Sequence, residues 1–196
     1  MKILVATENI GKFLEISQYL KWEGIDFTSQ KDLGFKSQPE IGQSFVENAI
    51  AKARFACRST GLIALAEDSG LVVPALNGDP GIYSARFAGA EATDSENLEK
   101  LLERMENLKN FERRAFFVCA MTLVRHEFDP LPIIAIGKWE GRITRSPMGE
   151  NGFGYDPVFF DEFTSKTAAQ MLKEEKLTLS HRGKALKSML ESLKNL

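Results

Sequence analysis

The residues best suited to chemistry stand side by side in the segment Glu67-Asp68-Ser69-Gly70. Short apolar runs flank this segment, so the pattern predicts a strand, a turn at which Gly70 lets the backbone reverse, and a second strand. Since neighbouring strand residues point to opposite faces, Glu67 and Asp68 are expected to do different jobs. A carboxylate held at the edge of a core suits a hard cation or an activated water. The alternative is a plain polar β-turn, and this stretch alone does not separate the two.

A second polar group follows the apolar run of residues 3–6, which predicts a strand covered on both faces. The next pattern predicts a helix with Asn9 as its N-cap. The free N–H groups and partial positive charge of a helix N-terminus suit a phosphate. Lys12 opposes the helix dipole in the first turn, so either it serves an anion site or it is a solvated surface lysine. The spacing is not that of a Walker P-loop.

A third group belongs to a helix that a capping box at Ser44 and Glu47 opens, and that runs to about residue 60. Asn48 and Lys52 share one face of this helix at i, i+4 spacing. Glu40 lies on the loop just before it. Solvent exposure is the alternative for all three of these side chains.

Residues 147–157 form a loop that is both glycine-rich and aromatic, directly before a short apolar strand. Such a loop can stack a planar ring against backbone, and Phe153 is the candidate. A wide hairpin connection with its aromatics in the core is the alternative. His181 and Arg182 open the last predicted helix, where donors meet a ligand or simply cap the helix.

The bulk composition is that of an ordinary globular protein, with 196 residues, 43% hydrophobic and 27% charged. A net charge of -2 gives no general attraction to nucleic acid or to an anionic membrane. Cys57 and Cys119 are far apart in apolar contexts, so we expect buried free thiols in a reducing compartment. With no signal peptide or membrane-spanning run in the sequence, a cytoplasmic protein is expected. No repeat or linker divides residues 1–196, which predicts a single domain.

Six motifs, in this order, resemble the inosine/xanthosine triphosphate pyrophosphatases, a family of house-cleaning enzymes. The motifs are Thr7-x-Asn9-x-x-Lys12, Ser44-Phe45-x-Glu47-Asn48-Ala49-x-x-Lys52-Ala53, Glu67-Asp68-Ser69-Gly70-Leu71, Pro80-Gly81-Ile82-Tyr83-Ser84-Ala85-Arg86, Gly152-Phe153-Gly154-Tyr155-Asp156-Pro157 and Ser180-His181-Arg182-Gly183. The resemblance runs from Lys2 to the final helix. None of the motifs is specific alone, but six in order leave little room for chance.

The resemblance implies an α/β fold, with an elongated mixed β-sheet flanked by helices and two lobes that hold the nucleotide in a cleft between them. It implies Mg²⁺ as cofactor and a homodimer. The expected substrates are non-canonical purine nucleoside triphosphates (ITP, dITP and XTP), hydrolysed to the nucleoside monophosphate and pyrophosphate. The elements predicted from the sequence agree with this fold: helices alternate with strands, and long strands and a final helix follow.

The resemblance and the charges together assign roles to the candidate residues. A triphosphate must be neutralised before water attacks, and lysines and a helix N-terminus supply that neutralisation, while Mg²⁺ takes one or two carboxylates. The expected roles are as follows: phosphate binding by Thr7, Asn9, Lys12, Lys52, Ser69 and Lys176; metal binding by Glu40 and Asp68; proton acceptance from the attacking water by Asp68; purine stacking by Phe153; and contacts to the base from the segments of Gly154, Tyr155, Asp156, His181 and Arg182. The metal and base roles compete for the one carboxylate of Asp68.

Two positions depart from the family pattern. Glu8 stands where glycine is usual and puts a carboxylate beside the expected phosphate loop, and Glu67 stands where a second aspartate is common. Two other functions stay open: a related pyrophosphatase for modified pyrimidine or methylated triphosphates, and a nucleotide sensor without turnover. A substrate panel distinguishes the first of these functions from purine triphosphate hydrolysis. A pyrophosphate-release assay distinguishes a sensor from an enzyme.

Overall fold

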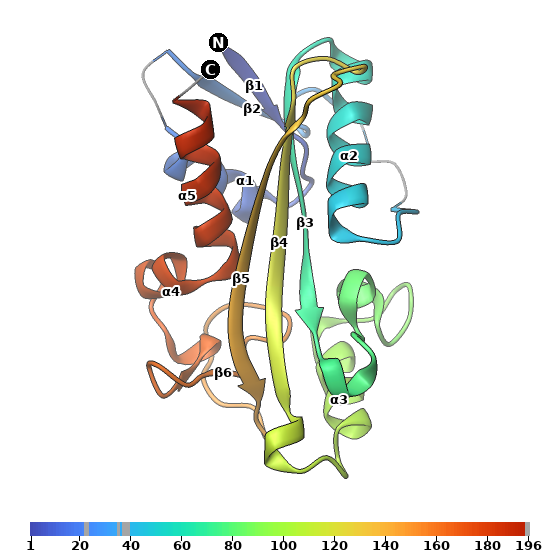
Figure 1. The fold of residues 1–196 in the computed structure, drawn as a ribbon, viewed down its shortest axis with the longest axis vertical. Coiled ribbons are helices and arrows are strands. Elements are labelled where there is room, and N and C mark those ends of the chain that lie inside the picture. The colour runs from blue at the N-terminus through green and yellow to red at the C-terminus, as the bar shows by residue number, and fades with distance from the viewer. Residues whose placement is uncertain (22–23, 35, 37–39, 195–196) are drawn as a thin grey trace. The chain divides into compact units, whose positions relative to one another are not determined.

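The computed structural model describes residues 1–21, 24–34, 36 and 40–194 (Figure 1). The strands are β1 (Lys2–Val5), β2 (Asp26–Ser29), β3 (Ile63–Val72), β4 (Arg114–Val124), β5 (Ile133–Ile143), β6 (Phe159–Asp161) and β7 (Lys166–Thr167). The helices are α1 (Ile10–Tyr19), α2 (Phe45–Thr60), α3 (Asp94–Arg104), α4 (Lys173–Leu179) and α5 (His181–Leu193). Short 3-10 helices occupy Pro74–Leu76, Gly81–Arg86, Asn110–Glu112 and Ala168–Gln170.

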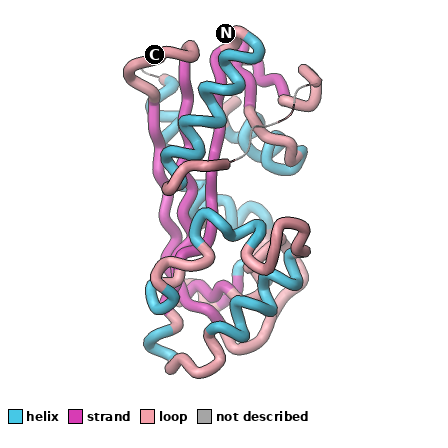
Figure 2. Tube along the Cα trace, turned by 90° about the vertical axis from the view of Figure 1, so that its right-hand side faces the viewer, coloured by secondary structure: helices cyan, strands magenta, loops and turns pink. Residues whose placement is uncertain are grey.

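The strands of the described residues form one seven-stranded sheet in the order β2-β1-β3-β4-β5-β6-β7. β1 pairs in parallel with β2 and with β3, whereas β6 pairs antiparallel with both β5 and β7. Helices flank the strands (Figure 2). The predicted class, an α/β protein with a mixed sheet flanked by helices, is therefore confirmed.

The chain divides into two compact units, each with its own core. Unit 1 comprises residues 1–68, 119–137 and 184–196, and unit 2 comprises residues 69–118 and 138–183. In unit 1, α2 presents Ala53 and Ala56 to the strands, and these small side chains pack with Leu4 of β1 and Ala64 of β3. Small side chains on one helix face let its backbone approach the sheet closely.

Unit 2 is built around large side chains. Its core joins Phe117 of β4, Trp139 of β5 and Phe159 of β6. The ring centroids of Phe117 and Phe159 lie 4.6 Å apart, and those of Trp139 and Phe159 lie 4.9 Å apart, both with tilted planes. Aromatic rings in such tilted contact add to the stabilisation from buried area.

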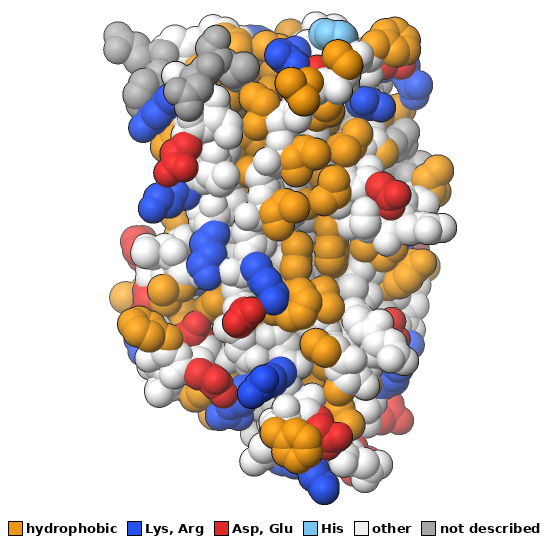
Figure 3. Space-filling view, viewed as in Figure 1, with side chains coloured by type: hydrophobic (Ala, Val, Ile, Leu, Met, Phe, Trp, Pro, Cys, Tyr) orange, Lys and Arg blue, Asp and Glu red, His pale blue; other side chains and the backbone are white. Residues whose placement is uncertain are grey.

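Not all apolar side chains are buried. On β5 within unit 1, Ile134 and Ile136 remain 42% and 57% exposed. In Figure 3, hydrophobic side chains gather on the face of the molecule that Figure 1 presents. No helix in the described part of the chain is long and apolar enough to cross a membrane.

The strand, turn and strand predicted around Gly70 are wrong: β3 continues without a break from Ile63 to Val72. The polar residues do not end the strand, because each acidic side chain has partners. Glu67 pairs with Lys12, and Asp68 accepts a hydrogen bond from Asn48. A buried charge is tolerated when it is paired and hydrogen-bonded.

The predicted helix starts are confirmed. Asn9 caps α1 by accepting a hydrogen bond from the backbone N–H of Lys12 at 3.1 Å. Ser44 caps α2 by accepting from Glu47 N at 3.2 Å. Since these caps satisfy N–H groups that lack partners within the helix, each fixes where its helix begins.

Candidate active site

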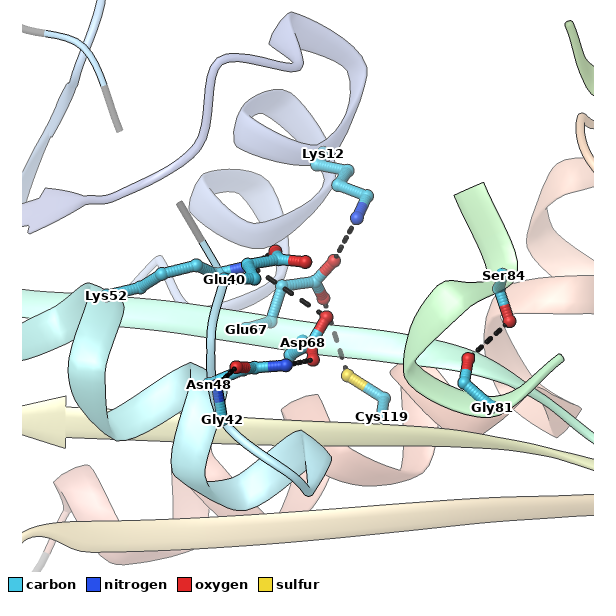
Figure 4. Close-up of polar contacts among 10 residues, drawn as sticks. All are labelled: Lys12, Glu40, Gly42, Asn48, Lys52, Glu67, Asp68, Gly81, Ser84 and Cys119. Atoms are coloured by element: carbon cyan, nitrogen blue, oxygen red, sulfur yellow. Dashed lines mark hydrogen bonds and ion pairs between the residues drawn. The ribbon is translucent and has the colours of Figure 1, made fainter. Parts of the chain in front are cut away.

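Three carboxylates and two lysines of unit 1 lie close together, and we call Glu40, Glu67, Asp68, Lys12 and Lys52 the carboxylate cluster (Figure 4). Lys12 Nζ lies 2.9 Å from Glu67 Oε1. Lys52 Nζ lies 2.7 Å from Glu40 Oε1 and 3.9 Å from Asp68 Oδ1. The structure therefore brings together residues from four separate parts of the sequence.

β3 places its two acidic residues among different neighbours. Glu67 meets Lys12 from the first turn of α1, and the thiol of Cys119 donates to Glu67 Oε2 at 3.4 Å. Asp68 meets Asn48 and Lys52, both from α2. Although they are neighbours in β3, the two acidic residues therefore have different partners.

Asn48 is a site residue that the sequence analysis did not predict, although it shares a helix face with Lys52, which was predicted. Its Nδ2 donates to Asp68 Oδ2 at 2.9 Å, and its Oδ1 accepts from Gly42 N at 2.8 Å (Figure 4). The i, i+4 relation of Asn48 and Lys52 was the available signal, since it placed both on the face that meets β3.

The charges of the carboxylate cluster do not cancel. Three carboxylates face two ammonium groups, and the side chains of Glu67 and Asp68 are only 2% and 9% exposed. Partly buried charges are screened little by salt. Within these five residues the carboxylates outnumber the ammonium groups, an arrangement that suits an additional cation.

A magnesium ion fits the residues that are present. No group of three or more His, Cys, Asp or Glu side chains suited to a metal exists among the described residues. Mg²⁺ is usually held by one or two carboxylates together with substrate phosphates and water, and does not require a complete protein cage. Glu40 and Asp68, which both approach the ammonium of Lys52, can supply those carboxylates.

The loop from β1 to α1 carries the other predicted phosphate ligands. Thr7 Oγ1 accepts from Asn9 N at 3.2 Å, while the Asn9 side chain is engaged in the cap of α1. Glu8, the unusual residue of this loop, accepts a hydrogen bond from Gln30 Nε2 at 3.4 Å. The loop is thus organised by side-chain hydrogen bonds at the start of a helix, where N–H groups favour an anion.

A second group of predicted site residues lies in unit 2, around the ring of Phe153. The Phe153 side chain is 54% exposed. Lys176 Nζ lies 5.1 Å from the ring centroid, and the guanidinium carbon of Arg182 lies 5.9 Å from it. Both cations are within the range of a cation–π interaction, so they orient an otherwise accessible aromatic ring.

Asp156 organises the loop that carries this ring. It is 3% exposed, and its Oδ2 accepts from Phe153 N at 2.9 Å and from Lys176 Nζ. Gly152 has a φ of +80°, and a Cβ there would meet Asp156 Oδ2 at 2.1 Å. Both the backbone conformation and the close approach therefore require glycine at residue 152.

A further residue that sequence reasoning missed is Asp94, at the first turn of α3. Its Oδ2 accepts from Gly154 N at 2.8 Å, which ties the Phe153 loop to that helix. A capping box of Thr93 and Glu96 fixes the start of that helix, but nothing in the sequence indicated a partner 60 residues away.

Tyr155 and His181 lie deeper than Phe153, in the core of unit 2. Tyr155 is 4% exposed and donates to Ser84 O at 2.8 Å. Burial raises the pKa of Tyr155, and the charge of Asp94 acts in the same direction. The His181 ring stacks on Phe117 with centroids 4.8 Å apart and planes 14° apart.

Lys176 and Ser69 are the remaining predicted phosphate ligands. Lys176 lies in unit 2 against Asp156 and Phe153, so its immediate partners are the residues assigned to the base. Ser69 is half-buried in β3, directly after Asp68.

The chemistry of these two groups defines a class. Carboxylates with excess charge suit a divalent cation, ammonium groups suit phosphate oxygens, and an exposed aromatic ring suits a planar base. An α/β protein with these three kinds of group has the chemistry to bind a nucleotide.

The chain belongs to the Ham1 family, whose model matches residues 3–192. It is 50% identical over 194 residues to the dITP/XTP pyrophosphatase of Escherichia coli K12, a match that covers 99% of this chain and 98% of that protein. The resemblance drawn from the six motifs is confirmed.

Two solved structures support the same assignment. A HAM1 protein from Coxiella burnetii has a TM-score of 0.96 at 44% identity, covering 100% of both chains. The Ham1 protein of Staphylococcus aureus has a TM-score of 0.90 at 38% identity, covering 100% of this chain and 99% of that one.

Proposed function

We propose that this protein is a nucleoside triphosphate pyrophosphatase that hydrolyses non-canonical purine nucleoside triphosphates (ITP, dITP and XTP) to the monophosphate and pyrophosphate. The observation that carries the proposal is the carboxylate cluster with its two lysines, in a chain 50% identical to a dITP/XTP pyrophosphatase. We further propose that it acts in the cytoplasm.

The lysines of the cluster bind the polyphosphate in this proposal. Lys12 stands at the N-terminus of α1, where its ammonium and the backbone N–H groups can neutralise the same anion. Lys52 supplies a second ammonium beside Glu40 and Asp68. Charge-assisted hydrogen bonds of this kind are about twice as strong as neutral ones.

Glu40 and Asp68 hold Mg²⁺ in this proposal. Mg²⁺ held there would supply positive charge that neutralises and polarises the phosphates. Asp68 also takes the proton from the attacking water, because its carboxylate is fixed and lies beside the proposed phosphate ligands.

The base is bound in unit 2. Phe153 stacks on the purine, as its exposed ring permits. Arg182, near that ring, and His181, next to it in sequence, supply donors that suit the 6-oxo group of hypoxanthine and xanthine. Adenine presents a donor at the same edge and would leave such groups unpaired, a mismatch that can cost roughly 10⁴-fold.

The experiment is pyrophosphate release across a panel of triphosphates with and without Mg²⁺. We expect ITP, dITP and XTP to be the best substrates, GTP to be weak and ATP the poorest. Comparable kcat/KM for ATP and ITP would contradict the proposed pocket. Turnover confined to modified pyrimidine or methylated triphosphates would replace the substrate class, and no turnover at all would indicate a sensor.

Chromatography of the products tests the cleaved bond. Water attack that breaks the bond between the α and β phosphates gives monophosphate and pyrophosphate together. Nucleoside diphosphate as the first product would refute the assignment, even if phosphate were released rapidly.

A further inference from the structure

Asn48 is a buried amide whose two ends contact two different parts of unit 1. The residue is 1% exposed. Its Nδ2 donates to Asp68 on β3 at 2.9 Å, and its Oδ1 accepts from Gly42 N, on the loop before α2, at 2.8 Å. Figure 4 shows the side chain extended from Gly42 to Asp68.

Gly42 belongs to the segment that carries Glu40. A Cβ built at Gly42 would meet Asn48 Oδ1 at 2.6 Å, Glu47 Cβ at 2.9 Å and Asn48 N at 3.1 Å. Real Cβ atoms do not approach other atoms as closely as 2.6 Å. The loop backbone therefore comes so close to Asn48 that only glycine fits without a shift.

We propose that Asn48 is the positioning residue of the carboxylate cluster, holding Asp68 with its Nδ2 and the Glu40 segment with its Oδ1. The proposal rests on the proposed function, since it concerns the two carboxylates assigned there to Mg²⁺. One amide thereby fixes a strand residue and a loop residue relative to each other.

The geometry explains why an amide is needed at this position. The carboxylate of Asp68 requires a donor and the N–H of Gly42 requires an acceptor, and a single asparagine side chain offers one of each. An apolar residue of the same size would leave both groups without this partner, and Asp68 is buried. Partners of metal ligands are typically worth 10–100-fold in metal affinity.

The first test variant is Asn48→Leu, which removes both hydrogen bonds at similar volume. The second is Gly42→Ala, whose added Cβ would clash with Asn48 Oδ1 and so disturb the contact between the loop and the amide. Because Gly42 lies on a partly exposed loop, this variant tests the proposal even if Asn48→Leu does not fold.

Asn97→Leu is the matched control. Asn97 is 2% exposed, and its amide also makes two bonds: Oδ1 accepts from Ala88 N at 2.7 Å, and Nδ2 donates to Ala85 O at 3.2 Å. Both asparagine variants lose the same kind of buried bridge, so thermal unfolding should show a similar fall in Tm for both.

Two measurements distinguish a positioning role from a purely structural one. They are kcat for ITP, and Mg²⁺ binding to the free protein measured by calorimetric titration. We expect Asn48→Leu to lower kcat by roughly 10²-fold with little change in KM, as misplacement by about 1 Å does. We expect both Asn48→Leu and Gly42→Ala to weaken Mg²⁺ binding by about 10-fold or more, and Asn97→Leu to do neither.

Several outcomes are decisive. Equal kcat and Mg²⁺ affinity in Asn48→Leu and Asn97→Leu, or unchanged Mg²⁺ affinity in Gly42→Ala, would overturn the positioning role. So would a wild-type protein that binds no Mg²⁺. If wild type binds Mg²⁺ but hydrolyses no triphosphate, the proposed function fails, and the titration alone decides the role of Asn48.

Discussion

Asp68 combines two features of a reactive carboxylate: one oxygen is fixed by Asn48, and the other lies within 3.9 Å of Lys52. The substitution Asp68→Asn keeps the shape but removes the charge that a cation or a general base requires. We expect turnover of ITP to fall by about 10²–10⁴-fold, the usual effect of losing a general base.

The control for Asp68→Asn is its stability. A near-wild-type Tm with lost turnover would show that chemistry, and not folding, was removed. A folded variant with a near-normal rate would reduce Asp68 to a strand residue of no catalytic importance.

Phe153 is the second residue whose role a single substitution tests. Stacking of a base on an aromatic ring is worth about 1–3 kcal/mol, so Phe153→Leu should raise KM for ITP by roughly 5–150-fold while kcat changes less. Phe163, also in unit 2, is 89% exposed and gives the matched control Phe163→Leu. Equal KM values in the two variants would exclude stacking by Phe153.

At the scale of elements, Asp129 holds the connection from β4 to β5. Its side chain is fully buried and accepts from Arg125 N, Nε and Nη2 and from Leu131 N, at 2.7–3.0 Å. The hydrogen bond from the Arg125 side chain is the main reason that the pKa of Asp129 lies far below its ordinary value of 3.8, against the opposing effect of burial.

Asp129→Asn should therefore destabilise the protein in a pH-dependent way. Since the folded-state pKa is depressed, the contribution of the carboxylate is present above its ordinary pKa of 3.8 and is lost as pH falls from there through the folded-state pKa. We expect a loss of about 1–3 kcal/mol in the free energy of unfolding at pH 7, and a smaller one at pH 3. Urea unfolding at both pH values measures it, and Asp26→Asn, at an exposed aspartate, is the control.

The elements also show where sequence reasoning succeeds. The starts of α1 and α2 follow from the capping side chains of Asn9 and Ser44, because a cap is a local contact over a few residues. β3 was misjudged because the partners that let Glu67 and Asp68 lie in a strand come from α1 and α2. The β-propensity of a residue type takes no account of partners from other elements.

The candidate site divides in the same manner. The members of the carboxylate cluster could be identified from residue type, because lysines bind anions and carboxylates bind cations. Asn48, which holds Asp68, and Asp94, which holds the Phe153 loop, act on partners 20 and 60 residues away. An asparagine within a helix or an aspartate in its first turn has many ordinary uses. Only three-dimensional contacts single them out.

At the scale of the whole molecule, we propose a homodimer, as the family resemblance implies. Sedimentation at micromolar concentration should give a mass twice the 21.9 kDa of the chain. Exposed apolar side chains such as Ile136 make such association favourable, because covering them removes apolar surface from water. A mass of one chain throughout the concentration range would contradict the proposal.

The two cysteines can serve as intrinsic probes of local unfolding in unit 1. Cys57 and Cys119 are both buried thiols outside any disulfide, both belong to unit 1, and the sequence has no other cysteine. Burial raises the pKa of Cys57, so little reactive thiolate is present in the folded state. The rate at which a thiol reagent labels the native protein therefore measures how often unit 1 opens, without any added probe and without a signal from unit 2.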